Sequence, residues 1–265
     1  MPSQQITDHK PKSLAEYIEI VEFLQRDSIG ALWYRGASKL SNQLLPSLYR
    51  KRANPDAFGH DLSQLEEQLV ARFRDRSLPY HNRELVDGLE TLFFMQHFGV
   101  PTRLLDWTAN PFVGLFFALR TARKGDRPAV WVLDPAKWNQ NALSRTSYSG
   151  GPLDPANELL SGYRQVGDMT SLSDAPVAIF GAHNSPRIVA QQGTFVIFGS
   201  QTFPMETLYR NGAFPEKSIS RIVIAGSAVE TLRNSIFSHG ITEGAMFPDL
   251  EGLGRDLRRT FGFNS

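Results

Sequence analysis

The chain has 265 residues, and its 28 lysines and arginines nearly balance its 27 aspartates and glutamates, which gives a formal net charge of +1 at pH 7. No global positive field draws in a nucleic-acid backbone, so any such binding must be local. Apolar residues make up 41% of the chain, which is enough for a core and too much for general disorder. The absence of cysteine excludes disulfides, thiol nucleophiles and cysteine-ligated zinc.

The N-terminal sequence "MPSQQITDHKPKSLAEY" has no basic segment followed by an apolar one, and no apolar run of about 18 residues occurs in the chain. We therefore expect a cytoplasmic protein without a membrane segment. Residues 1–12 are predicted to be a polar leader, followed by one folded domain over residues 13–265.

In the first part of the chain, helical spacing alternates with one strand pattern. Ser13, with Glu16 three residues later, is predicted to cap a helix that ends near Gly30. "ALWYRGAS" predicts a strand that runs into a turn at Gly36. Amphipathic spacing then predicts helices over residues 61–76 and 83–98.

The second part is predicted to be richer in strands. Asn110 and Pro111 are typical of a helix start, and "PFVGLFFALRTAR" should form a buried helix. Strands are predicted over residues 128–134, 176–180, 193–199 and 219–225, and helices over 227–239 and 250–259. Residues 139–176 are predicted to be a loop or a lid. This order predicts an α+β domain with a central mixed or antiparallel sheet flanked by helices, and a helical N-terminal part.

Between two apolar stretches, the segment "QHFGVPTRLLDWTANP" carries several polar or charged residues, among them Gln96, His97, Arg103, Asp106, Thr108 and Asn110. We expect them to line one pocket, because buried charge costs several kcal/mol unless it is paired. The alternative is structural: Arg103 and Asp106 form an internal ion pair on a turn or short strand, Asn110 only caps a helix, and His97 satisfies last-turn carbonyls.

Two further stretches carry candidate site residues. In "WYRGAS", Arg35 presents a bidentate fork suited to phosphate or carboxylate, and Gly36 lets a ligand approach closely. The alternative is that Arg35 pairs with a carboxylate such as Asp106. In "RIVAQQGTFVIFG", Arg187, Gln191 and Gln192 precede a strand, and the alternative there is a surface turn.

Common catalytic motifs are absent from the sequence, including a phosphate-binding P-loop, a zinc-protease helix motif and a nucleophile elbow. The six histidines have no metal-ligand spacing, so we expect no metal site. The basic runs "LYRKR" and "RDLRR" leave a nucleic-acid partner open, although such runs are usually solvated faces.

Together, "WYRGAS", "MQHFGVPTRLLDWTANPFVGLFFA" and "RIVAQQGTFVIF" resemble the FRG domain family of bacterial and phage proteins in order and spacing. The resemblance extends from about Ala15 to Arg259. Membership of that family does not by itself imply a reaction.

A more distant similarity connects the same three blocks to ADP-ribosyltransferases of the R-S-E type, with Arg35, Thr108 and Gln191 in the order of that NAD site. The similarity implies that Arg35 holds phosphate or the nicotinamide ribose, that Thr108 supports the pocket wall and that Tyr34 or Trp107 stacks on nicotinamide. The implied catalytic residues are Arg35, Asp106, Thr108 and Gln191. The implied cofactor-binding residues are Tyr34, Gly36, Gln96, His97, Arg103, Trp107 and Asn110.

The sequence departs from that superfamily at the third motif, where Gln191 and Gln192 stand in place of the catalytic glutamate. A neutral amide cannot supply the electrostatic stabilisation of a carboxylate. Asp106, Glu158 or Glu66 would have to replace it. Two hypotheses follow: an NAD-dependent ADP-ribosyltransferase-like enzyme of toxin or phage-defence type acting on a macromolecule or nucleotide, or a non-catalytic module that binds a nucleotide or a protein.

Overall fold

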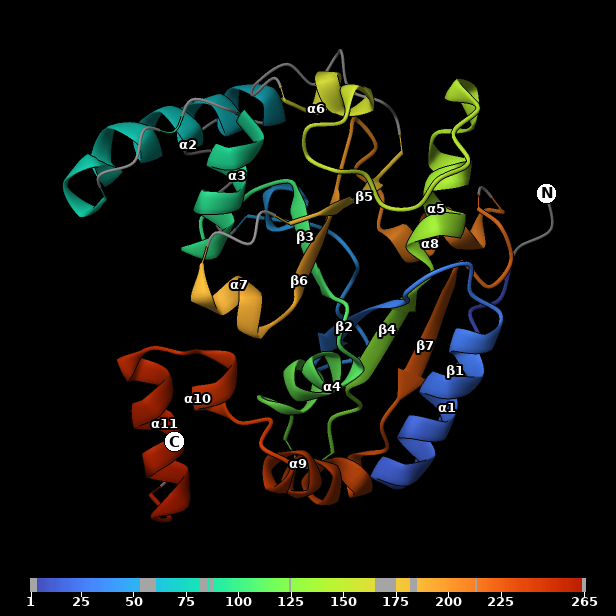
Figure 1. The fold of residues 1–265 in the computed structure, drawn as a ribbon, viewed down its shortest axis with the longest axis vertical. Helices are drawn as coiled ribbons and strands as arrows, with labels where there is room; N and C mark the ends of the chain where they lie inside the picture. The colour runs from blue at the N-terminus through green and yellow to red at the C-terminus, as the bar shows by residue number, and fades with distance from the viewer. Residues whose placement is uncertain are drawn as a thin grey trace.

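A seven-stranded sheet runs through the computed structural model, with helices packed against both of its faces (Figure 1). The structure describes residues 4–52, 61–81, 85, 88–123, 125–164, 175–181, 185–212 and 214–263. The fold is a single α+β domain, as the order of predicted elements indicated. No helix in these described ranges is both long and apolar enough to cross a membrane.

The strands are β1 (Asp8–His9), β2 (Trp33–Ala37), β3 (Leu104–Thr108), β4 (Ala129–Leu133), β5 (Val177–Phe180), β6 (Gly193–Ile197) and β7 (Ile219–Val223). Their order across the sheet is β1-β7-β4-β2-β3-β6-β5. Strand β1 pairs with β7 in parallel and every other neighbouring pair is antiparallel, so the sheet is mixed.

Strand β1 corrects the prediction that residues 1–12 are a leader outside the fold. Asp8 and His9 are in register with Arg221 and Ile222 of β7. The Arg221 guanidinium donates to both carboxylate oxygens of Asp8, at 2.9 and 3.1 Å. Two residues are too few to show the alternation of a strand. Their pairing partner, β7, also lies near the other end of the chain, so no local pattern indicates the pairing.

One face of the sheet is covered by α1 (Leu14–Arg26), α4 (Pro111–Leu119) and α9 (Val229–Ser238). The predicted caps are confirmed: the Ser13 side chain accepts from the Glu16 amide, and the Asn110 side chain accepts from the Phe112 and Val113 amides. Helix α1 ends at Arg26, before the predicted end near Gly30.

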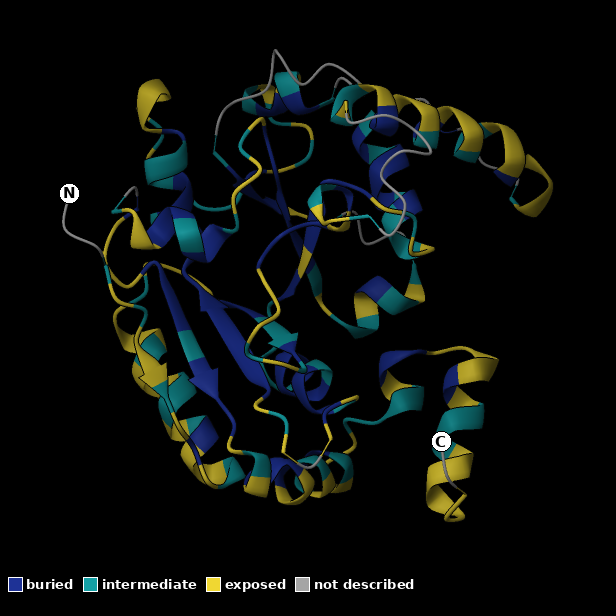
Figure 2. Ribbon diagram, turned by 180° about the vertical axis from the view of Figure 1, so that it is seen from behind, coloured by how far each residue is buried: buried dark blue, intermediate teal, exposed yellow. Residues whose placement is uncertain are grey.

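The opposite face carries α5 (Pro135–Ala142) and α8 (Met205–Arg210). Alternate residues of β4 point to the two faces: Val130 and Val132 pack in the cluster with α4, and Trp131 and Leu133 pack in the cluster with α5 and α8. A third cluster packs α2 (Leu62–Ser77), α3 (Gly88–His97) and α6 (Ser161–Arg164) against the strands β3, β5 and β6. The strands are almost wholly buried between these helices (Figure 2). The remaining α-helices in the described part of the chain are α7 (Pro186–Ala190), α10 (Glu243–Met246) and α11 (Leu250–Thr260).

Parts of the predicted loop or lid over residues 139–176 pack into the core, whereas residues 144–147 are exposed. Helix α5 continues to Ala142, and Leu153, Leu160 and Tyr163 are buried in the third cluster. None of the described residues between 139 and 164 lines the cavity described below. Residues 165–174 of this segment lie outside the described ranges.

Helix α4 lies directly on strand β2 because glycines face each other at the contact. A Cβ on Gly36 would overlap the Ala118 nitrogen and the Gly114 carbonyl oxygen, and a Cβ on Gly114 would lie 2.7 Å from the Tyr34 Cβ. The glycine after Arg35 is therefore needed for helix packing, whether or not a ligand approaches it.

We expect Gly36→Ala to lower the free energy of unfolding by about 1–3 kcal/mol, because helix α4 would have to move away from β2. Chemical denaturation measures the change. Gly30→Ala is the matched control, since a Cβ on Gly30 meets no atom within 4 Å. Equal stabilities of the two variants would contradict this packing.

Candidate functional site

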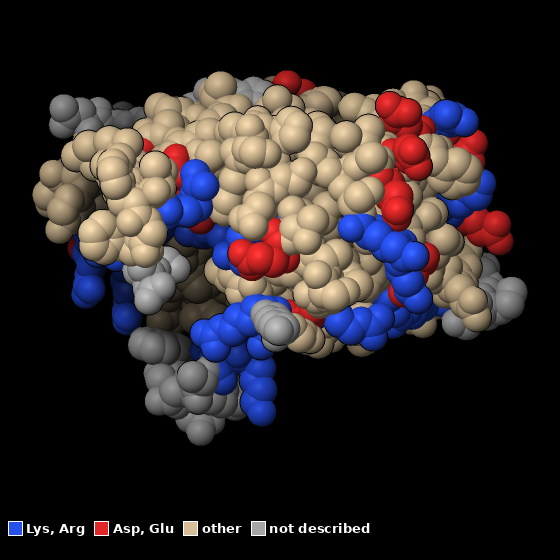
Figure 3. All heavy atoms as spheres, turned by 90° about the horizontal axis from the view of Figure 1, so that it is seen from below, with Lys and Arg blue, Asp and Glu red and all other residues tan. Residues whose placement is uncertain are grey.

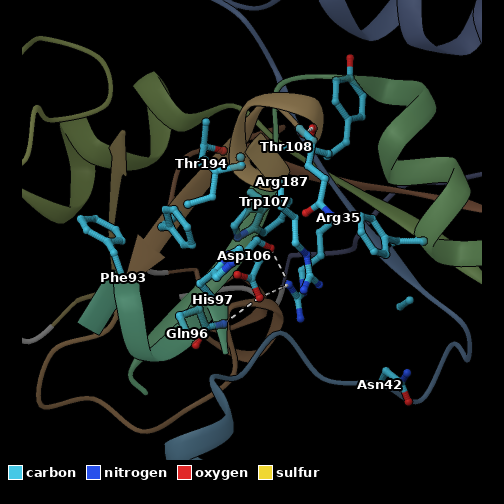
Figure 4. Close-up of a pocket in the computed structure, with 18 of the residues that line it drawn as sticks. Arg35, Asn42, Phe93, Gln96, His97, Asp106, Trp107, Thr108, Arg187 and Thr194 are labelled. Atoms are coloured by element: carbon cyan, nitrogen blue, oxygen red, sulfur yellow. Dashed lines mark hydrogen bonds and ion pairs between the residues drawn. The ribbon is translucent and has the colours of Figure 1, made fainter. Parts of the chain in front are cut away.

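Strands β2 and β3 are neighbours that share only a small part of their length. Their single register pair is Tyr34 with Thr108, whereas β2 with β4 and β3 with β6 each have five pairs. The Arg35 side chain crosses the opening: its Nη1 donates to the Asp106 carbonyl oxygen and lies 3.8 Å from the Asp106 Oδ2 (Figure 4). The alternative prediction that Arg35 contacts the Asp106 carboxylate is confirmed at the distance of a loose ion pair.

A cavity of about 340 Å³ lies at this opening. It is lined from β2, α3, β3, α4, α7 and β6, which are distant in sequence. Nine of the predicted site residues are among those that line it: Tyr34, Arg35, Gly36, Gln96, His97, Asp106, Trp107, Thr108 and Gln191.

The Asp106 carboxylate is held on one side by an ordered amide. The Gln96 Nε2 donates to Asp106 Oδ2 at 2.8 Å, and the Thr102 hydroxyl donates to Gln96 Oε1 at 2.6 Å. Because the Thr102 hydroxyl fixes which end of the amide faces the strand, Gln96 presents a donor to Asp106. The Asp106 side chain is 55% exposed in a strand whose other residues are buried, so it is open to a ligand.

The rest of the cavity's charge is positive. Arg187 of α7 lines it together with Arg35, and among the described lining residues Asp106 is the one carboxylate. The Arg187 guanidinium also lies over the Phe247 ring, 4.5 Å from its centroid, which anchors it. Burial lowers the pKa of both arginines, and Asp106 acts in the opposite direction on each. Because burial removes water from the two guanidinium groups, a bound anion would stabilise their positive charge.

Burial lowers the pKa of His97, and the neighbouring Arg187 lowers it further. In the unfolded chain the pKa of His97 is higher, near the ordinary value of about 6.5. As pH falls, the unfolded chain therefore takes up the imidazole proton before the folded protein does, and the free energy of unfolding decreases through and below that pH. We expect His97→Gln to lose less unfolding free energy than the wild type between about pH 7.5 and pH 5.5. Denaturation at both pH values tests this, with exposed His239→Gln as control. An unchanged pH dependence in His97→Gln would contradict it.

Thr108 and Gln191 occupy the cavity wall with their polar groups already bonded. The Thr108 hydroxyl donates to the Gln191 carbonyl at 2.6 Å and accepts from the Asn110 amide at 3.0 Å. The Gln191 Nε2 donates to the Met246 carbonyl at 2.9 Å. These bonds connect the end of β3, the residues between α7 and β6, and the end of α10. Gln191, for which a surface turn was the alternative prediction, is part of the cavity wall.

Two predicted cofactor-binding residues lie elsewhere, and their placement corrects the prediction. Arg103 is fully buried, its Nε is 3.1 Å from the Glu66 Oε1, and its Nη2 donates to the Tyr163 carbonyl. The ion pair that the alternative prediction placed between Arg103 and Asp106 does not form. Arg103 precedes β3 and lies three positions before Asp106, so in extended chain the two side chains point to opposite faces. Asn110 caps α4 and does not line the cavity.

Several cavity residues were not predicted, and most of them are apolar. Phe93, Phe117, Ile188 and Phe195 line the cavity from four different elements. Phe93 lies three and four residues before Gln96 and His97, so helical spacing could have placed it on their face. The other three had no comparable signal, because only the tertiary fold brings them to β2.

Residues 30–127 match the family model described as FRG domain. This part of the chain, well under half of its length, is similar to FRG domains. The match contains the first two sequence blocks, with Arg35, Gln96 and Asp106, while the third block with Arg187 and Gln191 lies beyond it. The matched residues therefore contain β2, α3, β3 and α4 of the site, and α7, Gln191 and β6 follow them in the chain. No curated protein and no solved structure matches the chain.

Proposed function

We propose that the cavity binds NAD and that this protein transfers or hydrolyses its ADP-ribose, as ADP-ribosyltransferases of the R-S-E type do. One observation carries the proposal. Arg35 on β2, Thr108 at the end of β3 and Gln191 before β6 meet at one cavity, and β2, β3 and β6 are adjacent strands. This is the order of the three motifs in that type of NAD site.

The residues present fit parts of that ligand. Ligand pockets usually measure about 300–1,000 Å³, and this cavity is at the small end, suited to a nucleoside-sized portion. Phe93 and Phe117 offer aromatic surface to a nicotinamide ring, and the Arg35 and Arg187 guanidinium groups suit the pyrophosphate. The substrate would thus have its ring against the helices and its phosphates toward the arginines.

Asp106 is the carboxylate best placed for the chemistry. In the proposed reaction, the bond between the ribose C1′ and the nicotinamide nitrogen breaks, its electron pair stays on the nitrogen, and neutral nicotinamide leaves. An acceptor oxygen or nitrogen, or water, bonds to C1′ and loses its proton to Asp106. A negative charge close to C1′ would stabilise positive charge that develops on the ribose. Glu66, one of the other candidates, is paired with Arg103 in the core.

A non-catalytic nucleotide-binding module is the second candidate, and the third motif favours it. Gln191 stands where the superfamily has its glutamate, and its amide is engaged with Met246. A site in which Asp106 is the one carboxylate among the described lining residues is compatible with retaining NAD without cleaving it.

We expect Asp106→Asn to reduce nicotinamide release about 100-fold or more, the usual effect of removing a group that stabilises transition-state charge, while NAD affinity changes little. Product chromatography and calorimetry measure the two quantities. Glu158→Gln is the control, because Glu158 lies in the short helix over Glu158–Leu160 and does not line the cavity. Equal release by Asp106→Asn and the wild type would exclude the role of Asp106. Tight NAD binding without release in the wild type would support the binding module.

A further inference from the structure

A second cavity, of about 330 Å³, lies beside the first and shares Arg35, Gly36, Ala37 and Asn42 with it. Arg35 therefore borders both cavities. The second cavity differs in its lining: it has no aromatic residue, and Ser41, Asn42, Gln43 and Arg50 supply its polar side chains. A group bound there would lie next to the guanidinium that borders the proposed NAD site.

The segment that supplies most of the second cavity's lining is basic, and the Glu206 carboxylate, which accepts from the Leu44 amide at 3.1 Å, is itself buried. Residues 38–52 include Lys39, Arg50, Lys51 and Arg52 but no aspartate or glutamate. The Arg50 Nε donates to the Leu45 carbonyl at 2.9 Å, which fixes the guanidinium at the cavity. Within the described part of the chain, no carboxylate lies within 4 Å of Arg50. Its positive charge is close enough to Arg35 to lower the pKa of that side chain.

Basic side chains border a hollow on one face of the molecule, whereas acidic and basic side chains are mixed elsewhere on the same face (Figure 3). A chain with a net charge of only +1 thus concentrates cations locally. Local concentration of this kind is the electrostatic requirement for binding a polyanion.

We propose that the second cavity binds the phosphodiester backbone of a single-stranded nucleic acid. Arg50 lines the cavity and contacts a phosphate there, and exposed Lys39 and Lys51 of the same segment, which lie outside the lining, contact neighbouring phosphates. Exposed Ser41, Asn42 and Gln43 of the lining offer the donors and acceptors that base edges need. A single strand fits better than a duplex, because an unpaired base can enter a small cavity without the cost of extrusion from a stack. The binding of this strand is independent of the proposed function. Its role as the acceptor of ADP-ribose rests on that function.

Fluorescence anisotropy with a labelled single-stranded oligonucleotide of mixed sequence tests the proposal without NAD. We expect the triple variant Lys39→Ala, Arg50→Ala, Lys51→Ala to bind at least about tenfold more weakly than the wild type. Its plot of log affinity against log salt should be shallower by about 2, since each lost phosphate contact removes roughly 0.7 from the slope. The control removes three charges near α1: Lys10→Ala, Lys12→Ala, Arg26→Ala, all exposed residues. Lys51→Glu provides a second, single-site variant and should also weaken binding.

Unchanged affinity in the triple variant, or an equal loss in the control, would overturn the proposal. So would competition by an acidic peptide that matches the unlabelled strand, which would make the cavity a site for acidic protein. If the triple variant lost NAD affinity as well as strand affinity, the cavity would belong to the dinucleotide, and the proposal would fall. If the wild type binds the strand through these residues but releases no nicotinamide from NAD, strand binding stands and the proposed function fails.

Discussion

Replacing Arg35 with alanine is expected to weaken NAD binding by about 10- to 100-fold, because hydrogen bonds to a charged group contribute about 1.5–3 kcal/mol. Arg35 borders both cavities, and its guanidinium crosses the opening between β2 and β3. Removing the guanidinium should therefore remove contacts with the ligand and also change the geometry of the opening between β2 and β3. Isothermal calorimetry measures the change in affinity.

Two further variants separate these effects. Arg35→Lys keeps the charge but loses the planar fork, so its affinity should lie between those of the wild type and Arg35→Ala. Arg26→Ala, at the exposed end of α1, removes the same charge away from the site and should bind NAD as the wild type does. Wild-type affinity in Arg35→Ala would exclude Arg35 as a ligand-binding residue.

The largest effect on stability is expected at Glu66. Glu66 and Arg103 are 1% and 0% exposed, and the charged atoms lie 3.1 Å apart. Removing one member of a buried ion pair leaves the other charge in the core, which costs about 3–5 kcal/mol. We expect Glu66→Ala to lower the free energy of unfolding by that amount, measured by chemical denaturation.

Neighbouring Glu67 is exposed on the same helix, so Glu67→Ala is the matched control and should change stability by less than about 0.5 kcal/mol. Replacing the pair together, with Glu66→Leu and Arg103→Met, should recover much of the loss, because no charge is then left buried. Equal effects of Glu66→Ala and Glu67→Ala would show that the pair does not stabilise the fold.

Much of the fold could be predicted where the signal is local. Ser13 and Asn110 mark helix starts because their side chains accept from amides two or three residues later, an interaction within a few residues. Strand β3 was harder: it is buried on both faces except at Asp106, so it lacks the alternation of a half-exposed strand. Its central place in the sheet depends on pairing with β2 and β6, which no local pattern shows.

Some residues of the site could also be predicted from the sequence, and others could not. Arg35 and Asp106 were predicted as neighbours, and they lie together because β2 and β3 are adjacent in the sheet. Arg103 was assigned to the ligand because its residue type suited one, but Glu66 on α2 holds it in the core. Sequence separation hides such a partner. The wall residues Phe117 and Phe195 were missed for the same reason, since each also looks like ordinary core.

The most direct test of the account is nicotinamide release from NAD by the purified wild-type protein, alone and with a cell lysate that supplies acceptors, beside Arg35→Ala. An NAD-consuming site at this cavity predicts release by the wild type that is lost in Arg35→Ala. Absence of both release and saturable NAD binding in the wild type would contradict it, and the polar groups around Asp106 would then serve only to fix the opening between β2 and β3.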